Sequence, residues 1–333
     1  MDSIAVGPRR LLAVLAVLAA ALVSAGPAAA APATFEASFE ALCTPTDRGL
    51  EELSGLAFDG DVMYAIGDSG TDDKLAVLDS DCSVTRWLTV PVDPYDIEDL
   101  QFAGGALWLS DTGDNRQVRD TVALTRMSPV DGAGELHRLT YPDGKHDAEA
   151  LLIEASGRPV IVSKELIGIG AVYVPAGDVA VNDLPSPGPS ALVEVGPLPW
   201  SGPVTGGAVS ADGKVAALRT YGEVYLYWAA DGDIAKALTS GPGTQIAVPR
   251  QPQGEAVAFT PAGDLVIASE ASAGPLPPLQ ILRGASDLVR PADATESTTS
   301  GEAATGWGPK WWAVVALGVA AVVGIAIVWV RLR

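Results

Sequence analysis

Charged residues recur at two positions of a repeated motif, and they are the residues most able to do chemistry. Five segments align on a short motif that is followed by a turn and a second apolar run. The motifs begin at Ser54, Glu98, Glu149, Gly207 and Glu255, and the second runs end at Asp68, Asp111, Lys164, Arg219 and Glu270. If the repeats are equivalent in space, these side chains meet around one opening, where they can bind a polar ligand.

Two of the turns carry oxygen-bearing side chains in a pattern that suits a hard cation. They read Asp68-Ser-Gly-Thr-Asp72 and Asp111-Thr-Gly-Asp-Asn115. Oxygen ligands at alternate positions of a loop are typical of calcium sites. We therefore expect calcium ligands among Asp68, Asp72, Asp111, Asp114 and Asn115. The same residues could instead cap tight loops, because Asp and Ser side chains hydrogen-bond to nearby backbone.

The glutamates of the motif are candidate catalytic residues. Glycoside hydrolysis needs one carboxyl group as acid and a second as nucleophile or base, and Glu98, Glu149 and Glu255 could supply both. His146, three residues before Glu149, is a further candidate base or ligand.

The basic residues could take part in phosphoester hydrolysis, or they could have a purely structural role. Phosphoester hydrolysis would place Arg116, Lys164 and Arg219 around a bound cation. Alternatively, these bases pair with the glutamates and fill the channel, since buried charges need partners. The residues that we expect to bind a ligand are Asp68, Asp111, Arg116, Lys164, Arg219 and Glu270.

The repeat also predicts the elements that position these residues. Short apolar runs between turn residues are typical of β-strands. A period of 44 to 58 residues, with room for four strands, is typical of a propeller. We expect an all-β, five-bladed β-propeller, with six blades as the alternative because Gly-rich stretches could hide strands. The segment Thr34–Leu42 would supply the strand that the last blade lacks and so close the ring.

Both ends of the chain carry membrane signals. Arg9 and Arg10 precede a short apolar run that ends in small residues, which is typical of a signal peptide, here 1–30. The uncharged run from Trp311 to Val330 has the length of a membrane span, and the arginines after it favour a cytoplasmic end. We expect a propeller at 31–285, a flexible stalk at 286–306, and a transmembrane helix with a short tail at 307–333. The predicted location is the cell membrane, with the propeller outside.

Cys43 and Cys82 are the only cysteines. An even pair in an exported domain usually forms a disulfide bond. Such a bond would attach the closing strand to the first blade, whereas two free thiols are the alternative.

Composition excludes several classes of protein. The chain has 333 residues, 41 acidic and 21 basic, with a formal net charge of −20. This excess of acid argues against nucleic acid as a partner, because a nucleic-acid binder needs a basic face. Two histidines are too few for a three-histidine metal centre. The sequence contains no Gly-x-Ser-x-Gly motif, which argues against a standard serine esterase.

Longer runs of the sequence resemble a known family. They include Leu107-Trp-Leu-Ser-Asp-Thr-Gly-Asp-Asn-Arg116, Tyr141-Pro-Asp-Gly-Lys-His-Asp-Ala-Glu-Ala-Leu151 and Pro252-Gln-Gly-Glu-Ala256. These runs look like those of secreted actinobacterial β-propellers related to the phytase-like ("esterase-like activity of phytase") propellers. The resemblance implies a propeller, and the more distant phytase-like members imply calcium and phosphoesters, without catalytic residues that map onto this chain.

Three functions are compatible with these features. They are binding of a polar ligand or protein partner at an acidic channel mouth, calcium-dependent hydrolysis of phosphoesters or glycans, and an architectural role in the envelope. We favour binding, because a fold that many proteins share does not determine function. The expected partners are the membrane, through the C-terminal helix, and an unidentified polar ligand or envelope protein. Calcium is the one cofactor expected.

Overall fold

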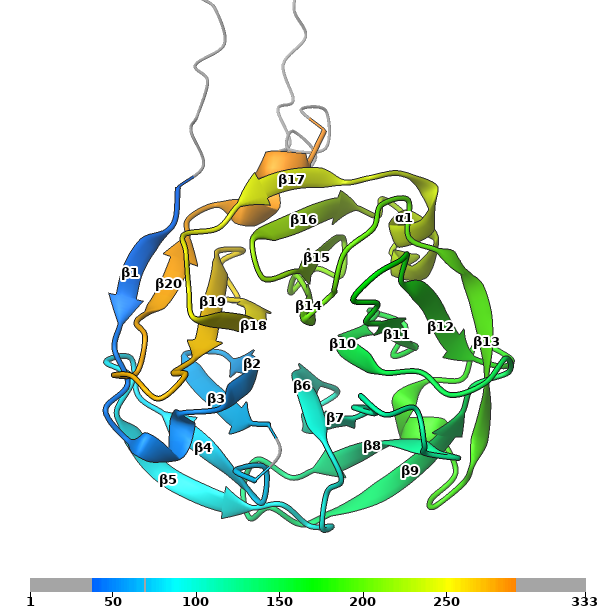
Figure 1. Ribbon diagram of the computed structural model, residues 1–333, viewed down its shortest axis with the longest axis horizontal. Coiled ribbons are helices and arrows are strands. Elements are labelled where there is room, and N and C mark those ends of the chain that lie inside the picture. Colours follow the sequence, from blue (N-terminus) through cyan, green and yellow to red (C-terminus); the bar gives the residue numbers. More distant parts are fainter. Residues whose placement is uncertain (1–37, 69, 292–333) are drawn as a thin grey trace, which may run out of the picture. The chain divides into compact units, whose positions relative to one another are not determined.

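A computed structural model describes residues 38–68 and 70–291, which form an all-β unit. Its strands surround a central axis, with β2, β6, β10, β14 and β18 innermost (Figure 1). The described elements also include α1 (Ile234–Ser240) and 3-10 helices at Arg48–Leu50, Val181–Asp183 and Ala285–Val289. The strands are β1 (Glu40–Cys43), β2 (Leu53–Asp59), β3 (Val62–Gly67), β4 (Lys74–Leu78), β5 (Val84–Thr89), β6 (Ile97–Ala103), β7 (Ala106–Asp111), β8 (Val122–Met127), β9 (Gly134–Thr140), β10 (Ala148–Ile153), β11 (Pro159–Ser163), β12 (Ala171–Pro175), β13 (Ser190–Pro197), β14 (Gly206–Val209), β15 (Val215–Arg219), β16 (Glu223–Trp228), β17 (Thr244–Ala247), β18 (Gln253–Phe259), β19 (Leu265–Glu270) and β20 (Leu279–Leu282).

These strands form four hydrogen-bonded sheets within the described residues. Three sheets have four strands each, in the orders β2-β3-β4-β5, β14-β15-β16-β17 and β1-β20-β19-β18. The fourth has eight strands, in the order β6-β7-β8-β9-β13-β12-β11-β10.

The expected ring of separate four-stranded blades, five or six in number, is wrong because two four-strand units are fused into one sheet. The outer strands β9 and β13 pair in parallel at Ser190↔Leu139 and Ala191↔Thr140. The repeated motif lies on the inner strands, so it carries no information about pairing between outer edges. The fold is β-propeller-like and includes one eight-stranded sheet.

The expected fold also included a C-terminal transmembrane helix. No helix within residues 38–68 and 70–291 is long and apolar enough to cross a membrane. The predicted signal peptide, 1–30, and the predicted span, Trp311–Val330, lie outside the described residues.

Apolar side chains fill the spaces on both sides of the inner strands. On β10, Leu152 belongs to a buried cluster with Leu218 of β15, while the neighbouring Leu151 belongs to a cluster with Leu124 of β8. Successive strand residues point to opposite faces, and here both faces are buried. The inner strands therefore appear in the sequence as continuous apolar runs rather than as alternating ones.

The N-terminal strand is attached to the end of the chain's last sheet. β1 pairs antiparallel with β20 through Glu40↔Ile281 and Ala41↔Gln280. Cys43, the last residue of β1, pairs with Leu279 and forms a disulfide bond with Cys82 in the turn between β4 and β5, with the two Cα atoms 5.7 Å apart. The predicted disulfide is confirmed, and it links the last sheet to the first.

Candidate functional site

The motif positions that carry side chains coincide with irregularities in the inner strands. The ladder between each such strand and its neighbour shifts register at the motif in β2, β6, β10 and β18. The residue skipped by the shift is Ser54 in β2, Glu98 in β6 and Glu149 in β10, and the shift in β18 spans Glu255. β14, whose motif begins with Gly207, pairs with β15 without a shift. Bulges redirect side chains, so the backbone itself sets the three glutamates apart from the ladder.

Seven carboxylates gather where the inner strands β6, β10 and β18 begin and where β3 and β19 end. Charge repulsion among them contributes to the raised pKa values of several members. We call this group the acidic mouth, and its members are Asp68, Asp96, Glu98, Asp147, Glu149, Glu255 and Glu270.

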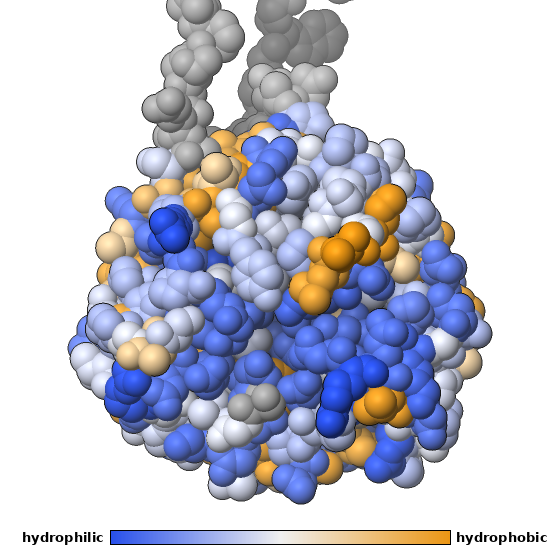
Figure 2. Space-filling model, viewed as in Figure 1, coloured by the Kyte–Doolittle hydropathy of each residue, from blue (hydrophilic) through white to orange (hydrophobic). Residues whose placement is uncertain are grey.

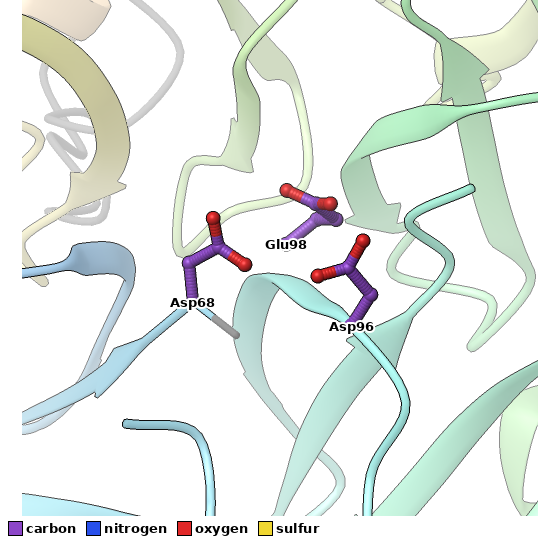
Figure 3. A group of neighbouring side chains, drawn as sticks. All are labelled: Asp68, Asp96 and Glu98. Carbon is purple, nitrogen blue, oxygen red and sulfur yellow. The ribbon is translucent and has the colours of Figure 1, made fainter. Parts of the chain in front are cut away.

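The acidic mouth contains two overlapping triads with the spacing of metal ligands. Asp68, Asp96 and Glu98 each offer an oxygen, and these oxygens lie within 4.8 Å of one another. Figure 3 shows their carboxylates turned toward a common point. The second triad is Glu98, Asp147 and Glu149, and one oxygen from each also lies within 4.8 Å of the others. Glu98 belongs to both, so it occupies the centre of the group.

Burial raises the pKa values of these carboxyl groups. It raises those of Glu98 and Glu149 well above the usual glutamate value, with added repulsion from Glu149 and Glu255 respectively. Burial raises the pKa of Glu255 to about 7, and burial with repulsion from Glu255 raises that of Glu270 to about 8. Without a cation, the mouth therefore holds protons at neutral pH.

A hydrogen bond between two carboxyl groups of the first triad also raises a pKa. Burial, followed by a hydrogen bond with Asp68, raises the pKa of Asp96 to about 7. Two carboxyl groups can share a hydrogen bond only when one of them is protonated. A bound cation would replace that proton and allow both groups to ionise.

Lys164 is the base that pairs with the mouth. Its ammonium group forms an ion pair with Oε1 of Glu149 and lies 5.5 Å from the ring centre of Tyr221. Burial lowers the pKa of Lys164, but Glu149 and Glu255 more than offset this effect, and the pKa is raised. The other oxygen of Glu149, Oε2, is buried and has no hydrogen-bond partner. One lysine thus leaves part of this carboxylate unsatisfied.

Arg219 is fully buried and hydrogen-bonds mainly to backbone carbonyl groups. Its guanidinium donates to the carbonyl oxygens of Ala256 and Ala268 and to the side chain of Gln251. Burial lowers its pKa to about 9. Although the sequence predicts Arg219 to be a ligand-binding residue, its hydrogen bonds to Ala256 and Ala268 tie β15 to β18 and β19.

The residues predicted as calcium ligands are not brought together as one group. Asp68 joins Asp96 and Glu98 instead. Asp111 pairs with Arg119 at 2.8 Å and accepts the backbone N–H groups of residues 95 and 96. Asp114 accepts the N–H groups of residues 118 and 119, so both carboxylates cap loops. Asp72 is buried and Asn115 is exposed, and neither belongs to a triad.

Two other predicted site residues lie outside the triads. The exposed Arg116 donates to the hydroxyl of Tyr95 at 3.2 Å. His146 lies 3.0 Å from Asp143 and 3.1 Å from the hydroxyl of Tyr173. Both side chains are therefore held by neighbours that do not belong to the acidic mouth.

The structure adds Asp96 and Asp147 to the site. Each lies two residues before a bulged glutamate, so the sequence contains the same Asp-x-Glu spacing twice, at Asp96–Glu98 and Asp147–Glu149. This recurring spacing was the signal that could have identified them.

Comparisons with known proteins do not assign a family. No protein-family model matches the chain, and no curated protein matches it in sequence. The resemblance to phytase-like propellers therefore finds no support there. Similar solved structures include glutaminyl cyclase from Myxococcus xanthus, at 10% identity and a TM-score of 0.45, covering 74% of this chain and 96% of that one.

Two further structures are more distant in shape. A nidogen/laminin complex has 11% identity and a TM-score of 0.40, covering 65% of this chain and 72% of that one. Hydrazine synthase from Kuenenia stuttgartiensis has 11% identity and a TM-score of 0.37, covering 70% of this chain and 84% of that one. At this level of similarity none of the three supports an inference about function.

Proposed function

We propose that this protein is a binding protein whose acidic mouth takes up a divalent cation, such as Ca²⁺, and holds a polar ligand there. The observation that carries the proposal is the pair of carboxylate triads that share Glu98. Hard cations prefer several carboxylate oxygens, and those oxygens are already close together.

The electrostatics of the mouth support a cation. Buried charges need a partner or an ion, yet Lys164 pairs with a single member of the group. Burial, together with repulsion among the carboxylates, raises the pKa values of Asp96, Glu98 and Glu149 and so disfavours their ionised forms. A divalent cation would relieve the repulsion among several carboxylates at once.

Calcium binding is tested by thermal unfolding and calorimetry on the full-length chain. Calcium should raise the melting temperature, because a ligand that binds the folded state stabilises it. Glu98→Gln should weaken calcium binding by at least about tenfold, since it removes a charged ligand from both triads. In the absence of calcium, this variant should be as stable as the parent or more stable, because it removes a buried carboxyl group whose ionised form is unfavourable.

Glu135→Gln is the matched control, because Glu135 is an exposed glutamate on β9. It should respond to calcium as the parent does. The proposal would be contradicted if calcium did not change the melting temperature of the parent, or if it raised that of Glu98→Gln by the same amount.

We also propose that the domain functions outside the cytoplasm. The disulfide bond between Cys43 and Cys82 supports this location, because structural disulfides persist in oxidising compartments. Digestion of intact cells with an added protease tests it, since a cytoplasmic domain would be protected.

A further inference from the structure

The loop that follows β11 exposes an unusual amount of apolar surface. Its tip is Leu166-Ile167-Gly168-Ile169, in which Leu166 is 72% exposed, Ile167 97% and Ile169 53%. A single exposed aliphatic side chain is ordinary, but a contiguous apolar patch often marks an interaction surface. We call these three aliphatic residues the apolar tip.

Both ends of this loop are anchored. The backbone N–H of Lys164 donates to the carbonyl of Asp147 at 2.8 Å. At the other end, Ala171 donates to the hydroxyl of Ser163 at 2.9 Å, and Leu198 donates to the carbonyl of Gly170 at 2.8 Å. The tip is thus presented to solvent from a fixed base, which lowers the entropy cost of binding a partner.

The apolar tip adjoins the acidic mouth. Lys164, whose side chain pairs with Glu149 in the mouth, is two residues before the tip begins. Figure 2 shows a hydrophobic ridge beside the hydrophilic centre of this face, where the loop after β11 runs in Figure 1. One partner could therefore contact both surfaces at the same time.

We propose that the mouth and the apolar tip together bind a segment of a partner protein in which a basic side chain adjoins large aliphatic ones. This inference rests on the proposed function and names the class of its ligand. The basic group would face the mouth, where the carboxylates outnumber Lys164 and Arg219 even with one divalent cation bound. Within the mouth, the buried Oε2 of Glu149 has no hydrogen-bond partner and is an acceptor for such a group.

Charge complementarity favours a basic protein segment over an anionic lipid surface. The chain carries a formal net charge of −20, which would repel acidic headgroups. Complementary charge also speeds association and selects the partner, while burial of the aliphatic side chains supplies affinity.

The test measures peptide binding by fluorescence anisotropy, with the full-length chain in detergent. The probe is a labelled peptide with one lysine followed by two leucines. It should bind more tightly than peptides in which serine replaces both leucines or glutamate replaces the lysine. Ile167→Ser should weaken binding about tenfold, because a large aliphatic contact is lost, and Leu166→Ser should act in the same direction.

Val130→Ser is the matched control. Val130 is 73% exposed, but it lies in the turn between β8 and β9. Since Asp111 at the end of β7 pairs with Ala123 near the start of β8, that turn is at the opposite end of the strands from the mouth. Val130→Ser should leave binding unchanged, and it also corrects for partition of the peptide into detergent.

Calcium binding distinguishes failure of this inference from failure of the proposed function. Ile167→Ser should keep the parent's affinity for calcium. Equal peptide binding by Ile167→Ser and the parent, or equal binding of the leucine and serine peptides, would overturn the inference even if calcium binds. A shift from dimer to monomer on Ile167→Ser, without any peptide effect, would overturn it in favour of self-association.

Discussion

Asp99 is the buried carboxylate that holds the inner strands together beneath the mouth. It accepts N–H groups from Leu100 in its own strand, Leu151 in β10 and Gly207 in β14, at 2.8, 2.8 and 3.0 Å. Burial raises its pKa well above the usual value, although these hydrogen bonds oppose the rise. Asp99 is next to Glu98, yet the register shift separates their roles: one residue points into the mouth and the other secures the backbone.

Replacing Asp99 with asparagine should destabilise the fold without a direct effect on the mouth. An amide has one acceptor oxygen, so at least one of the three N–H groups would face an NH₂ group and lose its partner. We expect a loss of about 1–3 kcal/mol in the free energy of unfolding, measured by urea denaturation. The exposed Asp183 is the control, and Asp183→Asn should change little. Equal stability of Asp99→Asn and the parent would show that these hydrogen bonds add nothing.

The elements of this fold depend on connections made at strand edges. β9 and β13 join two units through two parallel residue pairs, and β1 joins the first part of the chain to β20. Such short ladders contribute few hydrogen bonds. A covalent link at β1 should therefore contribute strongly to the free energy of unfolding. The disulfide bond provides this link between β1 and the turn after β4.

Removing the disulfide should therefore lower stability substantially. Its cysteines are 39 residues apart in sequence, and closing a loop of that length in the unfolded chain corresponds to about 3–4 kcal/mol. The double variant Cys43→Ala/Cys82→Ala should lose that amount in urea denaturation under oxidising conditions. The reduced parent should behave like the variant. Equal urea midpoints for the oxidised parent and the variant would contradict the prediction.

At the scale of the whole molecule, the excess of acid is concentrated at one opening and makes stability depend on pH. In the unfolded chain, aspartate and glutamate lose their protons near pH 4. In the fold, Asp96 and Glu255 hold theirs until about pH 7 and Glu270 until about pH 8. Between these values the folded state binds more protons than the unfolded state does.

When the folded state binds more protons, the free energy of unfolding falls as pH rises. The contribution of these groups should therefore make the calcium-free protein less stable as pH increases from about 4 to about 8. Calcium competes with the protons, so its stabilising effect should be larger at pH 8 than at pH 5. Scanning calorimetry at matched ionic strength tests this, and an equal calcium effect at both pH values would contradict it.

The order of residue types is enough to predict the local features of this protein. Short apolar runs between turns predict strands, and the recurrence of Glu98, Glu149 and Glu255 at equivalent positions predicts that they share a site. The cysteine pair predicts its own disulfide. The strands and the shared site follow from residues that are neighbours in the chain or that recur at similar intervals, and the disulfide follows from the presence of one pair of cysteines.

Which side chains meet depends on contacts between segments that are distant in the sequence. Pairing of β9 with β13 involves strand edges about 50 residues apart, and no residue type specifies that contact, so the separate blades expected from the repeat were wrong. The grouping of Asp68 with Asp96 and Glu98, rather than with Asp111 and Asp114, has the same cause. A carboxylate serves a site or caps a loop according to which N–H groups and charges the fold brings beside it, and those neighbours are distant in sequence.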